Sequence, residues 1–225
     1  EETTMKIIEN NRIFAFDGKN EPVAEVMDGE TVLFRTHDCF DNQLSEEGSC
    51  IGTLNWDRIN PATGPVYVDN AKAGDVLKVE ILEITLDKQG VMCALPENGV
   101  LGSLVKEESV KRIQVEEGKV HFNDKLVFDV TPMIGVIGVA PENGSINCGT
   151  PGCHGGNMDN KRIKVGASLY FPVFHDGALF SLGDVHAAMG DGEVMVSGVE
   201  ISADVKVRLS VMKGIRIETP MLENE

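Results

Sequence analysis

Hydrophobic residues recur at every second position in the last part of the chain. From Val199 to Val211 the apolar side chains alternate with polar ones such as Asp204 and Arg208. An alternation of period two is typical of a strand with one buried face. A second aliphatic run, from Val76 to Ile84, begins directly after Gly74-Asp75. Both runs predict β-strands.

Turn residues divide the rest of the patterned sequence into shorter strands. The segment from Lys111 to Val130 contains Glu117-Gly118 and Asn123-Asp124, which predict strands joined by tight turns. The segment from Ala167 to Asp184 is interrupted by Asp176-Gly177 and predicts a hairpin. The expected architecture is therefore a set of antiparallel strands.

The composition agrees with a mainly β fold, with sandwich-like or barrel-like sheets, long functional loops and little helix. Aromatic residues make up 5% and there are 24 glycines, which suits short strands and tight turns. Only Leu101–Glu108 predicts a short helical turn. We expect one β-rich domain over residues 1–225. The long loops Asp38–Pro65 and Pro141–Lys164 are the places where we expect function to reside.

The net charge and the cysteines limit the function classes. A formal charge of −16 excludes a nucleic-acid binder, which needs clustered Lys and Arg, and it is compatible with a neutral substrate. No apolar run reaches the length of a membrane span. The number of cysteines is odd and the N-terminal residues are unlike a signal peptide, so we expect reduced thiols and a cytoplasmic location.

Two segments carry most of the candidate chemistry. Asp184 and His186 are two residues apart at the end of a predicted strand, so both side chains point to one face. A carboxylate and an imidazole on one face can bind a metal ion. The alternative interpretation of the same two residues is a histidine that forms a salt bridge at the end of a strand. In His154–Asp159 the two glycines, Gly155 and Gly156, allow a ligand to approach the backbone. The alternative is a glycine-rich turn whose backbone is hydrogen-bonded by His154 and Asp159.

Several ordered motifs together resemble the acetamidase/formamidase family. The core motifs are Gly135–Pro141, His154–Asp159, Leu179–Asp184, His186-Ala187 and Gly190–Glu193, and Asn60–Val68 and Ala73–Leu77 are similar to the N-terminal motifs of the family. Asp38 and Gln43 fall where the family has an acidic residue and a glutamine. The resemblance implies a β-rich fold that hydrolyses short aliphatic amides, such as formamide and acetamide, to ammonia and a carboxylate.

The chain departs from the family pattern at two places. Cys153 stands where proline is expected before the His154–Asp159 motif, and we interpret it as a packing residue, not a nucleophile. Family members also continue beyond the point where this sequence stops. We therefore expect that the domain lacks a C-terminal segment.

The reaction implied by the resemblance needs a polarised carbonyl, an activated water and a proton for the leaving amine. A divalent cation can supply the first two. We expect zinc, with calcium as the alternative, held by residues drawn from Asp38, His154, Asp159, Asp184 and His186. Glu142 is the expected general base, with a solvated loop glutamate as its alternative interpretation. The amides of Gly155 and Gly156, or the side chain of Asn157, are expected to bind the oxyanion.

A substrate as small as formamide offers little surface for binding, so it implies a tight, closed cavity. Phe40 and Trp56, in the first long loop, are candidates for the walls of this cavity. The competing hypothesis is a non-hydrolytic metal-binding β-protein, either a cupin-like enzyme or a module that binds small ligands. Cupin-like sites use several histidines, and this chain has five in all. We also expect a homo-oligomer, a dimer or larger, because sheet edges invite partners.

Overall fold

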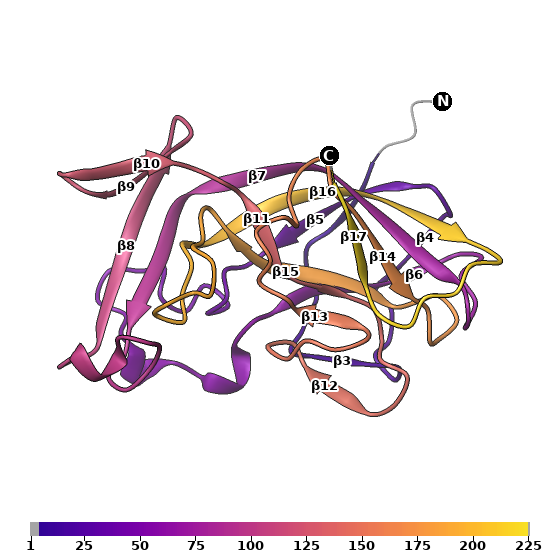
Figure 1. Cartoon of the computed structure of the whole chain (residues 1–225), viewed down its shortest axis with the longest axis horizontal. Coiled ribbons are helices and arrows are strands. Elements are labelled where there is room, and N and C mark those ends of the chain that lie inside the picture. The colour runs from indigo at the N-terminus through magenta and orange to yellow at the C-terminus, as the bar shows by residue number, and fades with distance from the viewer. Residues whose placement is uncertain (1–4, 225) are drawn as a thin grey trace.

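The computed structural model describes residues 5–224, and strands dominate this part of the chain (Figure 1). Its only helices are three short 3₁₀ turns, η1 (Ile51–Thr53), η2 (Trp56–Arg58) and η3 (Gly102–Leu104). The strands are β1 (Lys6–Ile8), β2 (Arg12–Ile13), β3 (Ala15–Asp17), β4 (Ala24–Val26), β5 (Thr31–Thr36), β6 (Ala62–Val68), β7 (Val76–Ala94), β8 (Ser109–Glu116), β9 (Lys119–Asn123), β10 (Leu126–Asp129), β11 (Met133–Gly138), β12 (Ser145–Asn147), β13 (Gly155–Asn157), β14 (Ser168–Pro172), β15 (Phe180–His186), β16 (Glu200–Met212) and β17 (Met221–Glu223).

Two long antiparallel strands, β7 and β16, form the axis of the fold. They pair from Val76 opposite Met212 to Val91 opposite Glu200. On the outer side of β7 its first half pairs with β14 and its second half with β8, whereas β16 continues to β5 and β15. Strands β8 to β10 therefore lie at one end of the molecule in Figure 1, and β4, β6 and β14 lie at the other.

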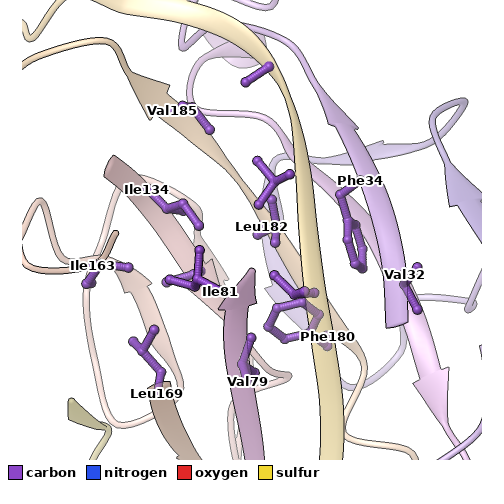
Figure 2. Close-up of a cluster of buried hydrophobic side chains, with 14 of the residues drawn as sticks. Val32, Phe34, Val79, Ile81, Ile134, Ile163, Leu169, Phe180, Leu182 and Val185 are labelled. Atoms are coloured by element: carbon purple, nitrogen blue, oxygen red, sulfur yellow. The ribbon is translucent and has the colours of Figure 1, made fainter. Parts of the chain in front are cut away.

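The core lies where these branches of the sheet fold over one another. Aliphatic and aromatic side chains from β5, β7, β11, β14 and β15 point toward one another in Figure 2. The Phe34 and Phe180 rings meet edge to face with their centroids 5.6 Å apart, and both are fully buried. The apolar face of β16 contributes to the same core. This core holds the end of β15, which carries Asp184 and His186, against β16.

Most of the predicted strand pattern is confirmed. The alternating run from Val199 forms β16 and the run from Val76 forms the start of β7. Residues 111–130 form β8, β9 and β10 in antiparallel pairing, and the expected helical turn is η3. The fold class is mainly β, as predicted.

The predicted hairpin over Ala167–Asp184 is wrong. Its two strands exist, but β14 pairs with β7 and β17, whereas β15 pairs with β6, β11 and β16. Ala178 and Leu179 both adopt left-handed backbone conformations after Gly177. The chain therefore turns away from β14 at this point, and β15 does not run back along it. Phe171 of β14 and Phe180 of β15 instead meet across the core, with ring centroids 6.4 Å apart.

The long loop between β5 and β6 has a small hydrophobic core of its own. Its buried residues pack with Val91 of β7 in a cluster separate from the main core: Cys39, Phe40, Leu44, Ile51 and Leu54. Asp38 fixes the start of this loop, because its Oδ1 accepts hydrogen bonds from the amides of Phe40 and Asn42, each at 2.9 Å. In residues 5–224 no helix is long and apolar enough to span a membrane.

Candidate functional site

A buried histidine lies between two carboxylates where β15 meets β16. His186 Nε2 is 3.2 Å from Asp184 Oδ1 and 3.0 Å from Glu200 Oε2. His186 and Glu200 are opposite each other in the register of the two strands, so strand pairing itself brings them together. The amide of Gly198 donates a 3.0 Å hydrogen bond to Glu200 Oε1 and fixes that carboxylate.

Two further carboxylates and a thiol complete this cluster. Ligand atoms of Asp159, His186 and Glu193 lie within 4.8 Å of one another, and so do those of Cys39, Asp184 and Glu200. We call the six residues the acidic centre. They come from the loop after β5, the loop after β13, the end of β15, the loop before β16 and the first residue of β16.

The backbone is unusual at three of these carboxylates. Asp159, Asp184 and Glu193 have φ angles of 40°, 53° and 38°, a left-handed conformation that non-glycine residues seldom adopt. Such conformations cost free energy and gather at functional sites. Gly135 on β11 makes room for them, because a Cβ there would lie 2.6 Å from Asp184 Oδ2 and 2.7 Å from Asp159 Oδ1.

Burial and mutual charge determine how the acidic centre is protonated. Burial raises the pKa of Glu200 to about 8, and burial together with Asp184 and Glu193 raises the pKa of Asp159 to about 7. Burial also opposes ionisation of Asp184, but the His186 imidazolium outweighs it and lowers the pKa of that carboxyl. His186 itself has a raised pKa, because Glu200 and Asp184 overcome the effect of its burial. The centre thus favours a bound positive charge.

The acidic centre opens into a cavity of about 680 Å³. Asp159, Asp184, Glu193 and Glu200 line its polar part together with Asn157. The carbonyl oxygen of the Asn157 side chain is buried without a hydrogen-bond partner. Polar groups that are buried and unsatisfied in a cavity are available to a ligand.

His154 lies elsewhere, in a second cavity of about 810 Å³ that shares no lining residue with the first. Glu142, Cys153 and Arg216 also line it. The His154 ring is 1% exposed, packs edge-on against Phe16 at 5.2 Å, and has no hydrogen-bond partner on either nitrogen. Burial lowers its pKa, so the ring is neutral at pH 7.

The structure therefore separates the residues that the sequence suggested as one site. Asp159, Asp184 and His186 come together, and Asn157 lies beside them. Asp38 does not join them, because its carboxylate caps the loop backbone, and His154 and Glu142 belong to the other cavity.

Neither glycine of the His154–Asp159 motif lines the cavity of the acidic centre. The Gly155 amide donates to the carbonyl of Gly152 at 3.0 Å, so it is not free for an oxyanion. A Cβ on Gly155 would lie 2.3 Å from the Ile137 carbonyl, and one on Gly156 would lie 2.3 Å from the Thr150 carbonyl. Close backbone packing explains both glycines.

Sequence reasoning missed Cys39, Glu193 and Glu200 as members of the centre. Glu200 stands on the polar side of the alternating run, yet it is only 3% exposed. No sequence signal marks it, because its alternation with Val199 and Ile201 is that of a solvent-facing position, whereas in the structure Ser197, Gly198 and Val199 before it are also buried. Glu193 lies in the Gly190–Glu193 motif, which marked it as a residue of interest without giving it a role.

The chain is similar in sequence and fold to several known proteins. A putative formamidase of Schizosaccharomyces pombe is 24% identical over 267 residues, which cover 89% of this chain and 65% of that protein. The structure of a predicted acetamidase/formamidase from Thermoanaerobacter tengcongensis has 49% identity and a TM-score of 0.94, over 98% of this chain and 74% of that one. An acetamidase structure from Bacillus halodurans has 46% identity and a TM-score of 0.94, over 97% and 74% of the two chains.

The chain spans 65% of the length of its S. pombe relative and 74% of the two solved relatives. The model of the Acetamidase/Formamidase family matches residues 9–147 and 146–225, which is nearly the whole sequence. The chain belongs to the Acetamidase/Formamidase family.

Proposed function

We propose that the acidic centre hydrolyses the amide bond of small neutral amides to ammonia and a carboxylate. The observation that carries the proposal is the convergence of four carboxylates around the buried His186, beside one cavity that these carboxylates and Asn157 line. The names of the relatives support an amide as the substrate. Only one of the five histidines belongs to the centre, which disfavours a cupin-like site.

The donor set of the centre fits a divalent cation. Asp159 Oδ1 is buried without a hydrogen-bond partner, and ligand atoms of Asp159 and His186 lie close enough to share one ion. Mixed nitrogen and oxygen donors favour zinc, and calcium is the alternative if only carboxylates and carbonyls contribute. When bound, such an ion polarises a carbonyl and lowers the pKa of a water molecule.

The residues of the chain have distinct roles in this proposal. Asp184 Oδ1 and Glu200 Oε2 both approach Nε2 of His186, so they lie beside the position that an ion bound to this nitrogen would take. Asn157 Oδ1, which lacks a partner, accepts a hydrogen bond from the amide nitrogen of the substrate at the cavity wall. Glu193 is the general base, because it lines the cavity and its carboxylate, 18% exposed, is 4.0 Å from His186 Nε2. It takes a proton from the attacking water and gives it to the leaving nitrogen.

Glu142 as the general base is the competing hypothesis. It would move the reaction to the cavity of His154, where Glu142 and Cys153 are both exposed. The centre itself offers no thiolate nucleophile, because burial raises the pKa of Cys39 well above the usual range. Water activated by a carboxylate remains the nucleophile in both hypotheses.

We further propose a homo-oligomer and a cytoplasmic location. Leu126 and Val127 on the edge strand β10 are exposed, which supports association through that edge. All five cysteines are free thiols, which supports a reducing compartment.

Ammonia release from formamide and acetamide tests the proposed function. We expect release by the isolated protein, loss of release after treatment with a strong chelator, and recovery when zinc or calcium is added back. A chelator for monovalent ions is the control and is expected to have no effect. Release that survives complete removal of divalent cations would overturn the metal-assisted mechanism.

A further inference from the structure

The cavity above the acidic centre is far larger than the smallest amides. Its volume is about 680 Å³, and it is partly open to solvent. A water molecule takes about 30 Å³ in the liquid, and formamide is about the size of two water molecules. A tight, closed cavity, which formamide would require, is therefore absent at the acidic centre. Cavities of this size normally hold ligands with a substantial apolar part.

One side of this cavity is apolar, while Asn60, Asn98 and Glu108 also belong to its lining. The loop between β5 and β6 lines it with Phe40, Ile51 and Leu54, which are 6%, 4% and 9% exposed and belong to the separate loop cluster. Leu95, directly after β7, and Ile59 add to this wall, and both pack against the same cluster. Trp56 lies at the rim and is 56% exposed. The cavity therefore has a polar end and an apolar end.

Cys39 marks the boundary between the two ends. Its thiol lies within the acidic centre, near Asp184 and Glu200, while the residue is part of the apolar loop cluster. An amide group placed at the acidic centre would thus project its acyl substituent along Cys39 and Phe40 into the apolar end. Contact with this wall removes apolar surface of the substituent from water, which favours binding.

We propose that the preferred substrates are amides with an apolar acyl chain of about four to six carbons, not formamide or acetamide. This inference rests on the proposed function, because it assumes that the amide group is cleaved at the acidic centre. The acyl chain fills the apolar end, and the primary amide faces Asn157 and the carboxylates. Each methylene that becomes buried is expected to raise kcat/KM about fourfold.

Gly52 offers a way to fill the apolar end without disturbing the fold. It lines the cavity, and a Cβ built on it has only Cys50 Sγ within 4 Å, at 4.0 Å. Its backbone is not left-handed, so a larger residue is not strained there. Gly52→Leu should occupy space that a long acyl chain needs. Gly52→Ala, which adds one methyl group in open space, is the matched control.

The experiment measures kcat/KM for formamide, acetamide, butyramide and hexanamide with the unchanged chain and both variants. We expect the unchanged chain to prefer hexanamide to acetamide by at least tenfold. Gly52→Leu should lose most of this preference, measured as the ratio of kcat/KM for hexanamide to kcat/KM for acetamide, and the smaller Gly52→Ala substitution should lose much less of it. A rate that is highest for acetamide and falls with chain length, or a preference that Gly52→Leu leaves intact, would overturn the inference.

A chain that releases ammonia from none of these amides rejects the proposed function instead. In that case, calorimetric binding of hexanamide decides the inference about the cavity. Binding that is tighter than that of acetamide and is weakened by Gly52→Leu supports the apolar end as a ligand site. Equal or undetectable binding of both amides overturns it.

Discussion

Replacing His186 by alanine is expected to abolish amide hydrolysis and to lower the metal content of the protein together with it. The ring is the only nitrogen donor among the side chains of the acidic centre, and it separates Asp184 from Glu200. Loss of a residue that merely orients a metal ligand costs about 10- to 100-fold, so loss of His186 should cost about 10²-fold or more in kcat/KM. Rate assays and elemental analysis of the same preparation measure both effects.

The same substitution should also reduce stability. Without the ring, the buried carboxylates of Asp184 and Glu200 lose the group that lies between them, and removing one partner of a buried pair costs on the order of 3 kcal/mol in the free energy of unfolding. Thermal unfolding followed by circular dichroism shows whether the variant is folded at the assay temperature. His121→Ala in β9 is the matched control, because it is a histidine outside both cavities. A folded His186→Ala protein with normal metal content and rate would contradict the account.

Glu193→Gln is expected to lower kcat by about 10²–10⁴ while most of the metal is retained. The amide keeps an oxygen donor near His186, but it cannot accept the proton of the attacking water. A loss of metal in proportion to the loss of rate would show that Glu193 is a ligand and not a base.

Glu142→Gln is the matched variant in the second cavity. The substitution is chemically the same, and Glu142 is exposed there beside His154. Under the present proposal its rate on acetamide stays within about twofold of the unchanged chain. An inactive Glu142→Gln protein beside an active Glu193→Gln protein would transfer the reaction to the cavity of His154.

Individual strands could be predicted because the alternation of apolar and polar residues depends only on residues that are close together in the sequence. β16 follows its apolar alternation from Ile201 to Leu209, and the turn at Glu117-Gly118 joins β8 to β9. Strand pairing depends on residues far apart in the sequence. The segment from Ala167 to Asp184 has the composition of a hairpin, but core packing directs its two strands to different partners.

The same limit applies to the site. Asp184 and His186 were paired correctly because they are two residues apart, but the neighbours that complete the site come from other segments. Cys39 reaches the centre through a folded loop and Glu200 through strand register. The expected ligand set also includes His154, from the same motif as Asp159. The chain between the two residues crosses β13, and their side chains end in different cavities.

The position of a bound ion tests the central claim most directly. A crystal soaked in a zinc salt, with anomalous diffraction data collected at energies on either side of the zinc absorption edge, locates the metal without reference to activity. The account predicts one strong anomalous peak within ligand distance of His186 Nε2 and the Asp159 carboxylate. A peak at His154 with none at His186 would contradict it and would place the reaction centre in the second cavity.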